Sequence, residues 1–409
     1  MLGGISILVN IATQWHATHA VEFTSEPAKV ALSILEGHGF SDPFLTGRSG
    51  PTAVIAPLYP YFYAFLCTVF GKGAAGWAAI VVLTSGVWAL QWAYAYRFAS
   101  AFGQKFPGLV AAFIGVIIPL QGRLFKWEGV FTGAALAYSA WALSQVLLRV
   151  NPKASAVRLG FGVGLTTLLC PSTILIWPFW AGLMFWRLGF ARSVRAQVPA
   201  FLFMVVPVGA WTVRNWITFG HLFFVRDSVG LEMRIAYNDC SSPLLNQNLD
   251  SGCFAKENPS RNPAQLERLR TLGEIEFFGQ DAARARSWIV SHPARTFQLT
   301  LAHFAYFWFP LDRSDKPALV YGILMSILTI LSLMAVYWRS DGALILLMAL
   351  VPFSAIYYLT QFEQRYRYPV LWISGVLAVV GVQLLVRRVE AGVADRQVSS
   401  ENPMARSGD

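Results

Sequence analysis

The chain has 409 residues, of which 55% are hydrophobic and only 13% are charged, and its mean hydropathy is +0.49. Because soluble globular proteins carry about 25% charged residues, this composition excludes a soluble enzyme, a disordered chain and a disulfide-framework peptide. The net charge of +10 would favour a nucleic-acid partner in a soluble protein, but no basic stripe with interleaved aromatic residues lies outside the apolar segments, so no nucleic acid is expected. Apolar segments recur along the chain, which predicts an all-α polytopic membrane protein.

A membrane-spanning helix needs about 20 apolar residues. By this measure we expect about ten spans, several of them short, near 1–13, 75–96, 107–120, 129–148, 157–170, 172–186, 198–216, 317–338, 342–359 and 368–387. Two further apolar stretches, 57–71 and 298–311, are shorter and have a proline near one end. They are predicted to be interfacial helices that lie in the membrane surface or dip into it.

The distribution of charge sets the expected topology. With residue 1 inside, the cytoplasmic pieces hold thirteen basic residues against five acids, whereas the segment 217–316 holds eleven of each. Since Lys and Arg accumulate in cytoplasmic loops, both termini are expected inside and 217–316 outside. The predicted domains are an N-terminal transmembrane module (1–216) with a first external loop (14–74), an external loop domain with an interfacial helix (217–316), C-terminal transmembrane helices (317–388) and a disordered cytoplasmic tail (389–409).

Few acids are present, and three of them lie near external span ends. Glu26 follows Ser25 and precedes Pro27, a pattern that starts a helix, here predicted over 27–37. Glu26 is therefore either a helix cap or a general base at the membrane face, where partial burial would raise its pKa. Glu22 is a weaker candidate for the same role. Glu128, at the start of a span, either snorkels or faces the same cavity as Glu26.

The candidate cations for a phosphate group are Arg365, Arg367, Arg214 and Lys126. Arg365 and Arg367 lie together before the last span, where arginine forks could bind phosphate oxygens bidentately. Their alternative role is that of interfacial anchors beside tyrosines. Arg214, at the outer end of its span, is a weaker candidate, and Lys126 lies two residues before Glu128.

The order of these features resembles the GT-C membrane glycosyltransferases that use polyprenyl-phosphate sugars. This group includes the protein O-mannosyltransferases, the lipid A aminoarabinose transferases and the rhizobial galacturonosyltransferases. The resemblance covers most of 20–370 and is strongest over 26–61, where it rests on the segments Val30–Phe44, Gly50–Ala53 and Ala56–Tyr61. Arg214-Asn215 and the segment Arg365–Pro369 are further matches.

The resemblance implies a GT-C-like helical bundle and places the family's catalytic acid at Glu26. It implies a polyprenyl-phosphate-linked sugar donor, an acceptor that is a lipid, a glycan or a protein, and an active site on the external or periplasmic face of the plasma (inner) membrane. One carboxylate suffices for an inverting displacement. Many members carry two acids where this chain has a single Glu before Pro, so a divalent metal is left open and no metal ligand is assigned.

A membrane transporter or flippase for a lipid-linked or polar solute is the main alternative. It would place ionisable residues near span midplanes and a broken helix in each half of the chain. The charges of this chain gather instead at the predicted external span ends, which favours the transferase.

Cys240 and Cys253 are predicted to form a disulfide. They are the two cysteines of the predicted external loop domain, where conditions permit oxidation, and the segment between them is rich in turn-forming residues. Two free thiols are the alternative.

Overall fold

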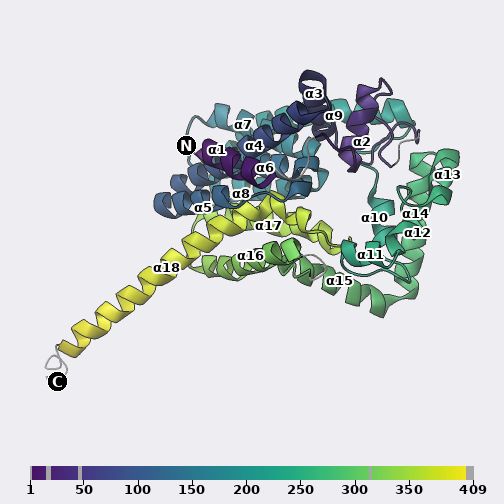
Figure 1. The fold of residues 1–409 in the computed structure, drawn as a ribbon. Coiled ribbons are helices and arrows are strands. Elements are labelled where there is room, and N and C mark those ends of the chain that lie inside the picture. The colour runs from purple at the N-terminus through teal and green to yellow at the C-terminus, as the bar shows by residue number, and fades with distance from the viewer. Residues whose placement is uncertain (1, 15–19, 45–47, 313–315, 402–409) are drawn as a thin grey trace.

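The computed structural model describes residues 2–14, 20–44, 48–312 and 316–401 of the 409. Within these ranges the regular secondary structure is helical, with two isolated β-bridges. The predicted all-α fold is therefore confirmed. Figure 1 shows a bundle of long helices, with α10–α14 grouped beyond one end of it and the C-terminal part of α18 running out at the opposite end.

The N-terminal module is a bundle in which α4 packs against α1, α5 and α6, and α7 packs between α6 and α9. Its elements are α1 (Leu2–Gln14), α2 (Glu26–Leu35), α3 (Leu58–Phe70), α4 (Ala74–Ala101), α5 (Lys105–Ile117), η1 (Gly122–Lys126), α6 (Gly129–Leu147), α7 (Pro152–Leu169), η2 (Pro171–Ile176), α8 (Trp177–Leu188) and α9 (Phe190–Phe219).

Small residues allow these helices to approach closely. A Cβ atom on Gly160 of α7 would lie 2.0 Å from the carbonyl oxygen of Ala200 on α9, and one on Gly162 would lie 2.4 Å from the Ser139 hydroxyl on α6. Such contacts between small residues replace the hydrophobic driving force that lipid does not supply. The Gly160–Gly164 segment is thus a helix-packing face.

In the segment 217–316, which we term the loop domain, the described residues form α10 (Val229–Ala236), α11 (Leu245–Asp250), α12 (Cys253–Glu257), α13 (Pro263–Leu272), α14 (Glu274–Ser291) and α15 (Pro293–Trp308). The first loop (14–74) contributes to its core, because Phe44, Val54 and Ile55 pack with Leu231, Ile235, Leu266, Leu269, Phe277 and Phe278. Burying a side chain such as Phe44 contributes about 2 kcal/mol. The two segments predicted to lie outside therefore share one hydrophobic core.

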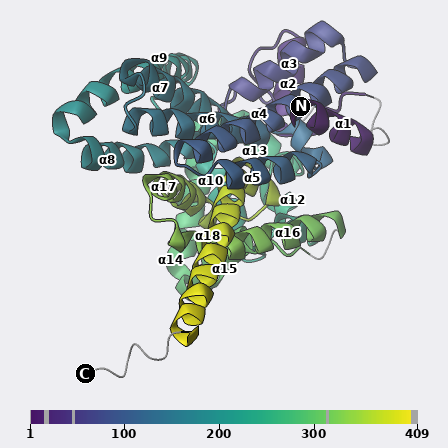
Figure 2. The ribbon, with the colours of Figure 1, turned by 90° about the vertical axis from the view of Figure 1, so that its left-hand side faces the viewer.

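The C-terminal helices return to the bundle. They are α16 (Lys316–Ser332), η3 (Leu333–Tyr337), α17 (Asp341–Ala355), η4 (Ile356–Tyr358), η5 (Gln364–Arg367) and α18 (Tyr368–Glu401). In Figure 2, α18 runs between α16 and α17 and projects beyond both. The helix continues through Glu401, into the segment predicted as a disordered tail, because 389–401 contains no proline and has a single glycine; residues 402–409 of that tail lie outside the described part.

Six described helices are long and apolar enough to cross a membrane, namely Ala74–Ala101, Gly129–Leu147, Phe190–Phe219, Ala318–Tyr337, Asp341–Tyr358 and Gln364–Ala394. The predicted short spans correspond to α1, α5, α7 and the η2–α8 pair, which are helical but do not meet this measure. The predicted interfacial stretch 57–71 is α3, which has 13 residues, too few to span. The stretch 298–311 falls largely within α15, which has 16 residues.

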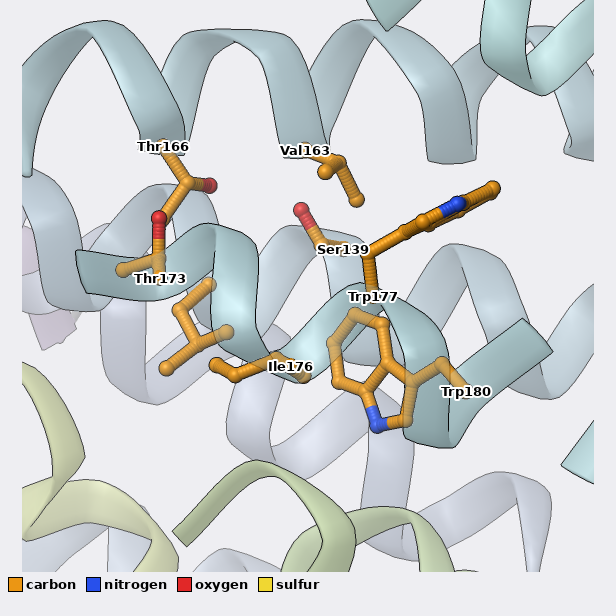
Figure 3. Close-up of a pocket in the computed structure, with 8 residues that line it drawn as sticks. Ser139, Val163, Thr166, Thr173, Ile176, Trp177 and Trp180 are labelled. Atoms are coloured by element: carbon orange, nitrogen blue, oxygen red, sulfur yellow. The ribbon is translucent and has the colours of Figure 1, made fainter. Parts of the chain in front are cut away.

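The interior of the bundle is closely packed where α6, α7, η2 and α8 meet. The cavity there measures about 10 Å³ and is lined by residues such as Ser139, Thr166, Thr173 and Trp180 (Figure 3). That volume accommodates about one water molecule. A substrate site therefore has to be sought elsewhere.

Candidate active site

A cavity of about 340 Å³ lies where the end of the N-terminal bundle, the start of the loop domain and the segment before α18 meet. Five of its lining residues are acidic or basic: Glu26, Glu128, Arg226, Glu232 and Arg365. The structure thus brings together Glu26, Glu128 and Arg365, which the sequence singled out separately. It adds Arg226 and Glu232, which the sequence analysis missed because they lie in a loop domain without net charge.

Local sequence positions Glu26. It is the first residue of α2, whose N-cap is Ser25, and Pro27 occupies the first turn, where its missing N–H is not needed. The Ser25 hydroxyl oxygen accepts from Ala28 N (3.3 Å), and the hydroxyl donates to the carbonyl oxygen of Lys126 (2.9 Å). The cap therefore joins the start of α2 to the segment that carries Glu128.

Arg365 contributes to the lining from the 3₁₀ turn before α18. Its guanidinium lies 3.2 Å from the centroid of the Trp127 ring, and its Nε is 2.6 Å from an oxygen of Glu363. The stacking and the ion pair fix the plane of the arginine fork. Its Nη1 is buried without a hydrogen-bond partner.

Several polar atoms of the lining are buried and have no hydrogen-bond partner. They are Glu128 Oε2, Arg226 Nε, Thr360 Oγ1 and Arg365 Nη1. Buried polar groups in folded proteins are nearly always hydrogen-bonded, and an unsatisfied one costs about 1–3 kcal/mol. Acceptors and donors left together in one cavity indicate a polar ligand that carries both hydroxyl and anionic groups.

The pKa values of two carboxylates in the cavity lining, Glu26 and Glu232, are raised. Burial raises the pKa of Glu26, and the negative charge of Glu232 adds to this effect, while Arg365 and Arg226 oppose it. Burial likewise raises the pKa of Glu232, against the opposing charges of Arg226 and Arg365. A carboxylate with a raised pKa is a stronger base and is matched to general acid–base work near neutral pH.

The cavity is also lined by apolar side chains that are exposed. Leu175, Phe224 and Val229 line it, and they are 40%, 41% and 57% exposed. Ile174 and Ile356 lie in the same lining. The cavity therefore joins a charged interior to an exposed apolar rim, an arrangement that fits a molecule with a polar head and a hydrocarbon chain.

Four predicted residues lie outside this lining. Lys126 pairs with Glu22, so these two neutralise each other. Arg214 donates to the carbonyl oxygens of Thr52 (3.0 Å) and Phe40 (3.2 Å) and thereby holds the first loop.

Arg367 is fully buried in the helix packing. It donates to the carbonyl oxygen of Phe307 (2.9 Å) and to the hydroxyl groups of Thr329 and Ser374. Arg365 and Arg367 are two residues apart on a 3₁₀ turn, which directs one to the cavity and the other to the helix core. Of the predicted pair, only Arg365 is placed to meet a ligand in this cavity.

Cys240 and Cys253 form a disulfide, with their Cα atoms 5.7 Å apart. Cys67 and Cys170 are free and buried, and Cys170 lines the cavity. Among the described residues, no group of three or more His, Cys, Asp or Glu side chains is arranged to hold a metal ion.

No protein-family model matches the chain, and no curated protein matches it. Solved structures of the oligosaccharyltransferase of the archaeon Archaeoglobus fulgidus have a similar fold. The complex with Zn and sulfate matches with a TM-score of 0.56 and 15% identity over 98% of this chain and 50% of that one. The complex of this enzyme, AglB, with an inhibitory peptide and a dolichol-phosphate matches with a TM-score of 0.54 and 13% identity over 100% and 51%.

The structure of the same enzyme tethered to an acceptor peptide matches with a TM-score of 0.56 and 14% identity over 95% and 49%. The chain therefore spans about half the length of the structures it matches. At this identity the likeness concerns the fold alone, which resembles that of the oligosaccharyltransferase AglB. It does not distinguish among the three groups of GT-C enzymes that the sequence resembles.

Proposed function

We propose that this protein is a membrane glycosyltransferase that moves a sugar from a polyprenyl-phosphate donor to an acceptor at the outer face of the plasma membrane. The observation that carries the proposal is the cavity itself. It combines a half-buried carboxylate at a helix start, two arginines and an exposed apolar rim. The GT-C-like fold supports the same reading.

The donor would enter sideways from the bilayer. Its hydrocarbon chain would lie against Leu175, Phe224 and Val229, where apolar surface is already exposed. Its phosphate would sit between Arg226 and Arg365, whose unpartnered nitrogens supply charge-assisted hydrogen bonds. The sugar hydroxyl groups would bond to the free oxygens of Glu128 and Thr360.

The transfer then needs one base. Glu26 removes the proton of the acceptor hydroxyl or amine, and the acceptor atom forms a bond to the anomeric carbon. The bond between that carbon and the phosphate oxygen breaks, and polyprenyl phosphate leaves with the electron pair. Arg226 and Arg365 stabilise the charge that develops on the leaving phosphate. A single displacement of this kind inverts the anomeric centre.

The proposal is tested with the purified full-length protein in nanodiscs and a radiolabelled polyprenyl-phosphate sugar. Release of polyprenyl phosphate in the presence of membrane extract as acceptor source is measured for the wild type and for Glu26→Gln. We expect the variant to lose at least about a hundredfold in rate, the usual contribution of a general base. Glu22→Gln is the matched control, since Glu22 pairs with Lys126 outside the cavity, and its rate should stay close to that of the wild type.

Equal rates for the wild type and Glu26→Gln would show that Glu26 is a helix cap and not the general base. Movement of the intact donor across the bilayer, without release of polyprenyl phosphate, would instead support a flippase.

A further inference from the structure

We propose that the loop closed by the Cys240–Cys253 disulfide positions Arg365, and that Asn248 is the residue that links this loop to the arginine's segment. The inference rests on the proposed function, because it concerns the arginine that would hold the donor phosphate. It makes Asn248 a positioning residue that acts through Arg365.

Asn248 ties the two arms of the disulfide-closed loop together. Its side chain is fully buried; Oδ1 accepts from Ser242 N (2.7 Å), and Nδ2 donates to the Ser242 carbonyl oxygen (2.8 Å). The disulfide closes the same loop at its base, between residues 240 and 253. A segment with so many turn-forming residues is therefore held in one conformation by a side chain and a covalent bond.

The loop in turn holds the chain that precedes Arg365. Phe362 N donates to the Pro243 carbonyl oxygen (2.8 Å), and Leu245 N donates to the Phe362 carbonyl oxygen (3.1 Å). Asn248 Nδ2 also donates to Gln361 Oε1 (2.9 Å). Residues 359–363 lie between two 3₁₀ turns and have no helical hydrogen-bond ladder, so the loop satisfies the backbone groups of Phe362.

Arg365 follows this anchored segment within one turn. Glu363, which is adjacent to Phe362, lies 2.6 Å from Arg365 Nε, and the Trp127 ring packs against the guanidinium. A shift of residues 361–363 would therefore move both the partner and the backbone of the arginine. An arginine binds phosphate through a rigid fork, so misplacement costs affinity even when the charge remains.

The test measures equilibrium binding of radiolabelled decaprenyl phosphate, without a sugar, to the full-length protein in detergent. Asn248→Ala should weaken binding about fivefold, the loss expected from the one buried hydrogen bond that links it to Gln361. Gln361→Ala removes the same link from the other side and should weaken binding similarly, so the inference does not depend on the folding of one variant.

The matched control is Asn262→Ala in the same domain. Asn262 caps α13: its Oδ1 accepts from Ala264 N and Gln265 N, and its Nδ2 donates to the Lys256 carbonyl oxygen, so these hydrogen bonds stay within residues 256–265. Asn262→Ala should lower the thermal unfolding temperature as Asn248→Ala does and leave lipid binding unchanged. Equal loss of binding in both variants would show a merely structural effect and overturn the inference.

The decisive comparison uses Arg365→Lys. Because Asn248 acts through the arginine fork, Asn248→Ala should weaken lipid binding no further when Arg365 is already lysine. Additive losses overturn the inference, as does wild-type affinity in Asn248→Ala. If the wild type itself fails to bind decaprenyl phosphate, the proposed function falls and this inference falls with it. If the wild type binds and only the Asn248 effect is absent, the proposed function stands alone.

Discussion

Glu274 connects the first loop to the loop domain, and its substitution tests that connection. It is the first residue of α14 and is buried; its Oε1 accepts from Ala53 N (2.5 Å). Asp227 N donates to the Ala53 carbonyl oxygen (3.1 Å), and Arg214 holds the Thr52 carbonyl oxygen. Residues 52–53 are thus held by hydrogen bonds from the loop domain and from α9.

The size of the expected change in folding stability follows from the pKa of Glu274, which burial raises from 4.5 to about 7. The hydrogen bonds from Thr52 and Ala53 oppose this rise, the negative charge of Asp227 adds to it, and Arg214 opposes it. Between pH 4.5 and pH 7 the folded protein keeps a proton that the unfolded chain has lost, so stability falls as the pH rises through this window. The whole effect amounts to about 3 kcal/mol as an upper limit.

The measurement is the thermal unfolding temperature in detergent from pH 4.5 to pH 8 for the wild type and Glu274→Gln. Glutamine keeps an acceptor for Ala53 N and does not ionise, so its stability relative to the wild type should rise steadily across the window. Glu276→Gln, which removes an exposed carboxylate from the same helix, is the matched control. Parallel pH profiles for the wild type and Glu274→Gln would show that Glu274 does not keep its proton in the folded protein across this window.

Three further predictions concern charge, redox state and topology. Arg365→Lys should weaken polyprenyl-phosphate binding about tenfold, since lysine lacks the bidentate fork. Arg367→Lys should lower the unfolding temperature without a specific change in lipid affinity. The reverse pattern would show that Arg367 binds the phosphate and Arg365 stabilises the helix packing. Under denaturing, non-reducing conditions, thiol alkylation should leave Cys240 and Cys253 unmodified until a reductant is added, and mass spectrometry would detect a failure of this prediction. Alkaline phosphatase fused after residue 250 should be active and after residue 400 inactive, because the basic surplus lies in the predicted cytoplasmic pieces; the opposite activities would invert the topology.

Short-range signals made part of the site predictable. Ser25, Glu26 and Pro27 specify a helix start whatever surrounds them, so the predicted helix over 27–37 corresponds to α2 at Glu26–Leu35. Apolar composition likewise predicted helices without strands.

Which of the candidate residues meet in the cavity depends on long-range packing, which local sequence patterns do not reveal. Arg365 and Arg367 carry the same local signal, and only the contacts of Phe307 and Trp127 assign one to the helix core and the other to the cavity. Arg226 and Glu232 lie in a domain with balanced charge, and only folding brings them beside Glu26. Clusters of one charge sign are visible in a sequence, whereas mixed-charge sites are not.

The central claim is that the cavity receives the phosphate end of a lipid-linked sugar. Cryo-electron microscopy of the full-length protein in nanodiscs with excess decaprenyl phosphate tests it most directly. We expect phosphate density between Arg226 and Arg365, with the hydrocarbon chain leaving past Phe224 and Val229. Lipid density at another site, with this cavity empty at saturating lipid, would contradict it.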